Sequence, residues 1–458
     1  MTTIPATVRQ DLPRPNVIWI LSDQHRAHAM GCTGDPNVCT PNLDRMFEEG
    51  MSFTRAVSGS PLCAPFRGSL ITGQYPHKCV PGLHRRMPAE MPTVATVFNQ
   101  NGYDTAWFGK WHLDGNNEAT QGRSAMVYIP TERRGGFAHW EAYENNNSQW
   151  DCYVHGGDPK DGTQFLERME GYETDALTDR LIRWMERRPR AKEGENPHPF
   201  FAVLSVQPPH MPYVAPERFM AKYNPARLIL RPNVPDVPSV TKVARRELAG
   251  YYAMIENVDW NIGRLREALT RLGLDTSTHL IYFSDHGDMH GSHGHGTKLL
   301  PYAESIDIPM ILGGHIPRGQ HRQAHPPKLV NHVDIAPTTL GICGIDKPDW
   351  MPGCDYSGYR IFGREVTGEP DSAFLQIVEP ALGGRAVDRP WRGVVTADGW
   401  KYAVIEGAPW LMFNLNDDPY EQVNLVLMPA YRAESRRLQD RLAAWINDTG
   451  DQFRLPEP

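Results

Sequence analysis

The feature that most constrains the fold is a series of short, almost continuously apolar segments, each followed at once by polar or charged residues. They are residues 16–21, 103–108, 200–206 and 279–284. Uninterrupted apolar runs of this length are typical of strands that are buried on both faces. Because helical patterns separate them along the chain, the sequence predicts an α/β fold with a large, mostly parallel sheet flanked by helices.

The helical segments are recognised by their apolar stripes and by glycines just after their ends. Helices are predicted at residues 41–49, 93–100, 174–187, 242–272 and 334–340, and one more strand is predicted at residues 307–312. Residues 113–171 are polar, aromatic and weakly periodic. A stretch this long without clear periodicity is usually a functional loop region, so we expect it to select the substrate.

The character of the chain changes at about Val387. Short strand-like segments at residues 392–396, 401–405 and 410–415 precede an acidic turn and a helical pattern at residues 429–445. This order predicts a small antiparallel sheet with one helix. We therefore divide the chain into a catalytic domain, residues 14–386, and a small C-terminal α+β subdomain, residues 387–458.

Polar side chains that could do chemistry stand directly after the predicted strands. In a doubly wound parallel sheet, ligands bind outside the carboxyl ends of the strands. Because those ends share one edge of the sheet, we expect the side chains after them to converge on one site. They are Asp23, Lys110, His112, His210, Asp285 and His286.

The segment PLCAPFRGSLITG at residues 61–73 contains the candidate nucleophile, Cys63. Pro65 suits the first turn of a helix, because its missing N–H would find no partner there. Cys63 would then lie at a helix N-terminus, where free N–H groups and the positive end of the dipole favour an anion. Arg67, one turn along, would add donors shaped for a tetrahedral oxyanion.

The pattern Cys-x-Pro-x-Arg followed by Thr-Gly resembles the signature of the type I sulfatases, which belong to the alkaline phosphatase superfamily. Further blocks resemble those of the same family, and together they extend over about residues 14–425. They are GKWHL at 109–113, PPHMP at 208–212, SDHGD at 284–288, Lys298 with PYAES at 301–305, and FNLNDDP to NL at 413–425. The resemblance implies an alkaline phosphatase-like fold.

The resemblance also implies a cofactor chemistry. Cys63 would be oxidised to formylglycine by a formylglycine-generating enzyme, and the hydrated aldehyde, a gem-diol, would attack the sulfur of a small sulfate monoester. A divalent cation would be bound by Asp23, Gln24, Asp285, His286 and the oxygen of the modified Cys63. Oxygen ligands suit Ca²⁺ best, with Mg²⁺ as an alternative. The histidine leaves Mn²⁺ open as well.

The roles of the remaining site residues are implied by the same resemblance. Arg67, Lys110 and Lys298 would neutralise the sulfuryl oxygens together with the metal. His210, assisted by Lys298, would protonate the departing alcohol. His112 would then take a proton from the second hydroxyl, which expels sulfate and regenerates the aldehyde.

Two positions depart from the usual family pattern and leave alternatives open. Sulfatases often carry a second Asp where this chain has Gln24, and a Ser where it has Phe66. The Asp-Gln pair is similar to that of choline sulfatases and phosphonate monoester hydrolases, so a phosphonate monoester or phosphodiester hydrolase is the rival function. Lys110 and His112 favour the sulfatase. A non-catalytic anion-binding relative in which Cys63 stays a thiol is the alternative from a different class.

Charge and composition bound the partners and the compartment. The net charge of -7 argues against a broad nucleic-acid surface, and no apolar run is long enough to predict a membrane span. The N-terminus shows no secretory signal, and seven scattered cysteines fit a reducing compartment. We therefore expect the cytoplasm, or the periplasm if a signal was trimmed, and leave a homo-oligomer open.

Overall fold

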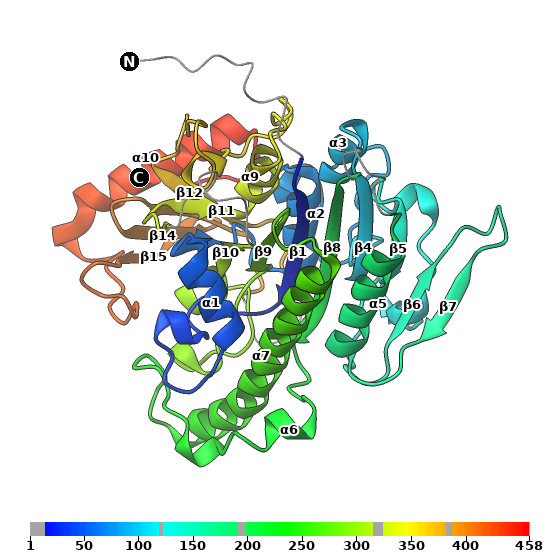
Figure 1. Ribbon diagram of the computed structural model, residues 1–458. Helices are drawn as coiled ribbons and strands as arrows, with labels where there is room; N and C mark the ends of the chain where they lie inside the picture. The colour runs from blue at the N-terminus through cyan, green and yellow to red at the C-terminus, as the bar shows by residue number, and fades with distance from the viewer. Residues whose placement is uncertain (1–13, 119–121, 190–197, 315–323, 382–386, 458) are drawn as a thin grey trace.

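A large mixed sheet forms the centre of the molecule (Figure 1). The computed structural model describes residues 14–118, 122–189, 198–314, 324–381 and 387–457. Within these ranges nine strands join in the order β2-β10-β9-β1-β8-β4-β5-β6-β7. The five central strands are parallel: β9 (Thr278–Ser284), β1 (Asn16–Asp23), β8 (Phe200–Pro209), β4 (Asp104–Lys110) and β5 (His139–Tyr143). The predicted α/β class with a mostly parallel sheet is confirmed.

The two edges of the sheet are antiparallel. β10 (Met310–Gly313) and β2 (Met51–Ser52) complete one edge, and β6 (Tyr153–Gly156) and β7 (Phe165–Arg168) complete the other. At the centre, Ile18 of β1 lies between Ala202 of β8 and Leu280 of β9. Every residue of β1 is buried, which explains why its sequence is apolar without alternation.

Helices cover both faces of the sheet. α1 (Pro41–Glu49), α5 (Glu173–Arg187) and α7 (Pro238–Leu272) pack on one face, and Figure 1 shows α7 running obliquely across it. α2 (Cys63–Thr72), α3 (Val94–Gln100) and α9 (Ile335–Ile342) pack on the other face. All ten residues of α2 are buried, so this helix is fixed on every side. No helix in the described ranges has the length and apolar character needed to cross a membrane.

Three strands lie in the region that the sequence predicted to be loop. β5, β6 and β7 fall within residues 113–171, and β5 continues the parallel sheet, with Ala106 opposite His139 and Lys110 opposite Tyr143. The prediction was wrong there because these strands are only four or five residues long. Most of β7 is also exposed at the sheet edge, so its sequence carries little apolar signal.

A second, smaller sheet follows near the C-terminus. β12 (Ser372–Ile377), β13 (Trp391–Thr396), β14 (Trp400–Ile405) and β15 (Ala408–Asn414) are antiparallel, and α10 (Arg432–Thr449) covers one face. The predicted antiparallel sheet with one helix is confirmed, although its first strand begins before Val387. The other face packs on the large domain through Val57 and Ile306, so the two sheets share a core.

Candidate active site

The carboxyl ends of the central strands meet around the N-terminus of α2. Asp23 is the last residue of β1, Lys110 is the last residue of β4, and Asp285 directly follows β9. Cys63 is the first residue of α2, and no side chain caps this helix end. The structure therefore brings together residues that are far apart in the sequence, as expected for the shared edge of a parallel sheet.

The Cys63 thiol lies among charged and polar groups. Its Sγ atom is 3.1 Å from Lys298 Nζ, 3.2 Å from His286 Nε2 and 3.7 Å from Asp23 Oδ1. The residue is only 2% exposed. The sulfur atom therefore lies at a helix N-terminus, beside an ammonium group, an imidazole and a carboxylate.

Asp23 connects the cationic side chains of the site. Its Oδ2 atom accepts hydrogen bonds from Lys110 Nζ at 2.7 Å and Arg67 Nη2 at 3.2 Å. Burial acts to raise the pKa of Asp23, but Lys110, His210, Lys298 and Arg67 outweigh it and hold this pKa well below its usual range. The carboxylate is therefore ionised, and it fixes the directions of both cations.

Arg67 is held by a serine that the sequence did not indicate. Arg67 Nη1 donates to Ser205 Oγ at 2.8 Å and to the carbonyl of Lys110 at 3.1 Å. Ser205 comes from β8, which lies against Gly109 of β4. Gly109 has φ +95°, and a Cβ atom there would lie 2.1 Å from the Ser205 carbonyl oxygen. Only glycine allows the two strands to approach this closely beside the site.

Four buried residues could hold a metal ion. Asp23, Cys63, Asp285 and His286 each offer a ligand atom, and these atoms all lie within 4.8 Å of one another. Asp285 Oδ2 is 3.4 Å from Arg67 Nη2 but makes no hydrogen bond. Burial and the neighbouring Asp23 raise the pKa of Asp285 to about 6. A cation would relieve this repulsion, so the residues present fit a divalent metal.

Gln24, predicted as a further metal ligand, lies between a lysine and a carboxylate. Its Oε1 atom accepts a hydrogen bond from Lys298 Nζ at 3.0 Å, and its Nε2 atom donates to Asp288 Oδ2 and to Tyr213 OH, the latter at 3.3 Å. Since an ammonium group only donates and a carboxylate only accepts, the orientation of the amide is fixed. Metal binding by Gln24 stays a prediction. Asp288 and Tyr213 had no predicted role.

The two histidines predicted as acid and base are held neutral. His112 is buried, and burial together with Lys110 and Arg67 holds its pKa well below the usual range. Burial and Lys298 lower the pKa of His210 to about 3. His210 Nδ1 lies 2.7 Å from the carbonyl oxygen of Met211. Because a carbonyl only accepts, Nδ1 carries the proton of the neutral ring and Nε2 carries none.

A second group of possible metal ligands has a different character. His293, Glu304 and Glu421 also offer atoms within 4.8 Å of one another. However, Arg231 Nε donates to Glu304 at 2.7 Å, and the Lys401 ammonium lies against Glu421 with both side chains buried. The two carboxylates are thus already paired with two cations. We interpret this group as an ionic junction between the large domain and the C-terminal sheet.

Comparison with known proteins identifies the family of this chain. The family model described as Sulfatase matches residues 15–345, which includes every residue of the site. The chain belongs to the sulfatase family. A model described as the C-terminal part of N-sulphoglucosamine sulphohydrolase matches residues 291–448, which include the small sheet. This sulfatase is a sulfuric ester hydrolase, and the resemblance drawn from its motifs is confirmed.

Individual relatives extend over most of the chain. An ulvan-active sulfatase of Formosa agariphila is 34% identical over 457 residues, which cover 97% of this chain and 84% of the relative. An endo-4-O-sulfatase of Bacteroides thetaiotaomicron is 30% identical over 383 residues, covering 74% of this chain and 72% of the relative. Both matches extend over more than two thirds of this chain and of the relative.

Solved structures agree on the fold. A Bacteroides fragilis protein assigned as the sulfatase yidJ superposes with a TM-score of 0.83 at 26% identity, covering 98% of this chain and 99% of that one. The phosphonate monoester hydrolase of Agrobacterium radiobacter superposes with a TM-score of 0.76 at 21% identity, covering 95% and 96%. The second likeness shows the shared fold alone. The predicted alkaline phosphatase-like architecture is confirmed.

Proposed function

We propose that this sulfatase hydrolyses a small sulfate monoester with a formylglycine derived from Cys63 and a bound divalent metal, Ca²⁺ before Mg²⁺ or Mn²⁺. The observation that carries the proposal is the position of Cys63. It begins a buried helix, 3.1 Å from Lys298 Nζ and 3.2 Å from His286 Nε2. A nucleophile formed there would meet an anionic ester among cations rather than in water.

Two further groups would add to the chemistry of these side chains. A divalent metal, which Asp23, Asp285 and His286 would hold, would supply Lewis-acid stabilisation, and the hydrated formylglycine would supply a nucleophilic hydroxyl. The chain itself supplies fixed positive charge. Arg67 and Lys110 are locked in place by Asp23, so they need no rearrangement when a sulfate group arrives. Such preorganised cations stabilise charge that develops on sulfuryl oxygens.

The histidines divide the proton transfers. His112 is neutral, which is the form that can accept a proton, and this suits its proposed role as the base that expels sulfate. His210 is neutral as well, so its role as the acid depends on the substrate. We propose that the negative charge of the bound ester raises the pKa of His210, because a nearby anion favours the imidazolium form.

The proposed mechanism is tested by the mass of the peptide that contains Cys63. The protein is produced with a formylglycine-generating enzyme, and the buried Cys79 serves as the control cysteine. We expect conversion of Cys63 to the aldehyde and none of Cys79, with sulfatase activity that follows the converted fraction. Fully active protein with an unmodified Cys63 would contradict the mechanism and leave a thiolate or metal-hydroxide reaction as the working model.

The same preparation separates the sulfatase from its rival. Matched aryl sulfate and aryl phosphodiester substrates differ at the reacting centre and share a leaving group. We expect the larger kcat/KM with the sulfate. A larger value with the phosphodiester would make the protein a phosphonate monoester or phosphodiester hydrolase on the same scaffold.

A further inference from the structure

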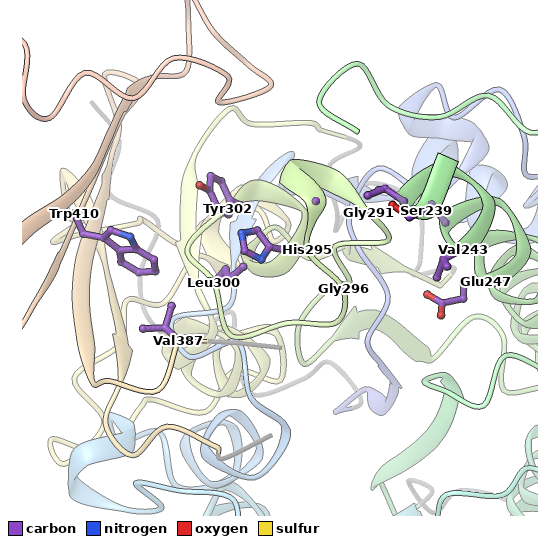
Figure 2. A pocket seen from close by; sticks show the side chains of 13 residues that line it. Ser239, Val243, Glu247, Gly291, His295, Gly296, Leu300, Tyr302, Val387 and Trp410 are labelled. Carbon is purple, nitrogen blue, oxygen red and sulfur yellow. The ribbon is translucent and has the colours of Figure 1, made fainter. Parts of the chain in front are cut away.

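A pocket of about 660 Å³ opens between the two domains (Figure 2). Its volume lies in the range of small-molecule sites. Figure 2 shows α7 on one side, the loop of residues 289–302 in the middle and β15 on the other side. The lining residues used below are Glu247 from α7, His295, Gly296, Leu300 and Tyr302 from the loop, and Trp410 from β15.

The loop that lines the pocket also carries Lys298, a residue of the candidate active site. Gly296 and Leu300 line the pocket, and Lys298, midway between them, reaches Cys63 Sγ at 3.1 Å. Thr297 and Leu299 have φ angles of 64° and 82°. The backbone thus turns sharply on both sides of Lys298. Such left-handed conformations of non-glycine residues are strained, and strained residues cluster at functional sites. One loop therefore places a side chain against the nucleophile and forms a wall of the pocket.

A sulfate ester bound at Cys63 has to place its alcohol part on this side. Asp23 and Asp285 are completely buried and Cys63 is 2% exposed, which closes the interior of the site. Lys298 and His210 are only partly buried. The alcohol part of the substrate therefore extends past Lys298 and His210, toward the loop whose residues Gly296 and Leu300 line the pocket.

The lining chemistry suits an uncharged sugar. Trp410, Tyr302 and His295 provide aromatic rings, and apolar ring faces bury the C–H faces of a pyranose. Glu247 is a carboxylate, which accepts hydrogen bonds from hydroxyl groups. None of the described residues that line the pocket is a lysine or arginine. A sulfate or uronate group would lose its water there without gaining a cation.

We propose that this pocket binds a neutral sugar unit linked to the sulfated one, so that the substrate is a sulfated oligosaccharide with an uncharged neighbouring residue. This inference rests on the proposed function. The alcohol that the reaction releases would then be the desulfated oligosaccharide. A small alcohol would reach the catalytic centre without touching Trp410 or Glu247. The pocket thus gives binding energy only to the longer substrate.

The test compares three substrates on the modified, metal-loaded enzyme. They are 4-nitrophenyl sulfate, sulfated galactan oligosaccharides with a neutral neighbouring unit, and chondroitin sulfate oligosaccharides with a uronate neighbour. We expect the galactan to have the highest kcat/KM. Trp410→Ala should raise KM for the galactan about tenfold, the loss of one aromatic contact, and leave 4-nitrophenyl sulfate within about twofold. Glu247→Gln changes the opposite wall and should raise KM in the same selective way.

Trp400→Ala is the matched control. Trp400 lies on the neighbouring strand β14 but packs against Tyr431, away from the pocket. An equal effect of Trp400→Ala and Trp410→Ala would mean that the small sheet is merely destabilised and would overturn the proposal. The proposal would also be overturned if Trp410→Ala and Glu247→Gln affected the aryl sulfate and the galactan equally, or if chondroitin sulfate were hydrolysed faster than the galactan. Failure to hydrolyse even the aryl sulfate would instead overturn the proposed function.

Discussion

Replacing Gln24 by Glu tests the reasoning about its fixed amide. In the native protein the Gln24 oxygen faces Lys298 and its nitrogen faces Asp288. Burial acts to raise the pKa of Asp288, but His290, Tyr213 and Gln24 outweigh it and leave this pKa below the ordinary value. In Gln24→Glu a carboxylate would therefore meet an ionised carboxylate in a buried site.

The expected loss of stability follows from the cost of one proton. Two carboxylates in contact do not both ionise, so the new Glu is held protonated. With an ordinary pKa of about 4.3, protonating it at pH 7 costs about 3.7 kcal/mol. Lys298 lies 3.0 Å from the oxygen at this position and attracts the ionised form, so this figure is an upper limit. We expect the free energy of unfolding to fall by about 2–3.5 kcal/mol at pH 7.

The pH dependence has a definite sign. The pKa of the introduced Glu is raised in the folded state, so the folded protein binds more protons than the unfolded chain. The loss is absent below about pH 4.3 and grows as the pH rises, reaching only about 1 kcal/mol at pH 5. Urea unfolding of the unmodified, metal-free protein at pH 5 and pH 7 measures this difference.

A second substitution provides the decisive comparison. Asp288→Asn places an amide donor opposite the new carboxylate, so the double variant should regain most of the stability that Gln24→Glu loses at pH 7. Gln452→Glu, at an exposed position, controls for the added charge. The reasoning fails if the loss in Gln24→Glu is equal at both pH values, or if the two substitutions are simply additive.

Three further outcomes are expected. Replacing His112 or His210 by Ala should lower kcat for an aryl sulfate by ~10²–10⁴-fold, and near-wild-type turnover in both variants would remove them from proton transfer. Lys401→Met leaves the buried Glu421 without its cation and should lower the free energy of unfolding in urea by about 3 kcal/mol. Adding Glu421→Gln should restore part of this stability. An unchanged stability in Lys401→Met would contradict the ionic junction. Burial raises the pKa of Glu144 to about 7. The folded protein then binds more protons at Glu144 than the unfolded chain, so this residue makes the free energy of unfolding fall as the pH rises from about 4.3 to 7. Glu144→Gln should make this pH dependence less steep, and an unchanged pH dependence would contradict the raised pKa.

Parts of the fold and site that depend on local pattern could be predicted from the sequence. β1 is a continuous apolar run because both of its faces are covered, and the residue that ends it, Asp23, must then lie at the ligand-binding edge. Cys63 at the start of a helix followed from Pro65. In these cases a few neighbouring residues contain the physical cause of the structure.

Other parts depend on contacts between distant segments. Gln24 and Asp288 are 264 positions apart, and Tyr213 and Asp288 are 75 apart, so no local pattern reveals that they share hydrogen bonds. Ser205 is an ordinary small residue in an apolar strand, and only the close approach of β4 and β8 brings it to Arg67. The positions of such residues follow from tertiary packing, which a single sequence does not display.

The burial of α2 sets a time limit on any enzyme that modifies Cys63. The groups that close over its sulfur, His286 and Lys298, lie 223 and 235 positions further along the chain. A ribosome adds ~5–20 residues per second, so the first of these follows Cys63 by roughly 10–45 s of synthesis. During that interval neither of these two groups is yet part of the chain, whereas in the folded protein Cys63 is only 2% exposed. If Cys63 is converted as proposed, competition between the modifying enzyme and folding would set the fraction of molecules with a modified nucleophile, and a molecule that folds first would keep its thiol.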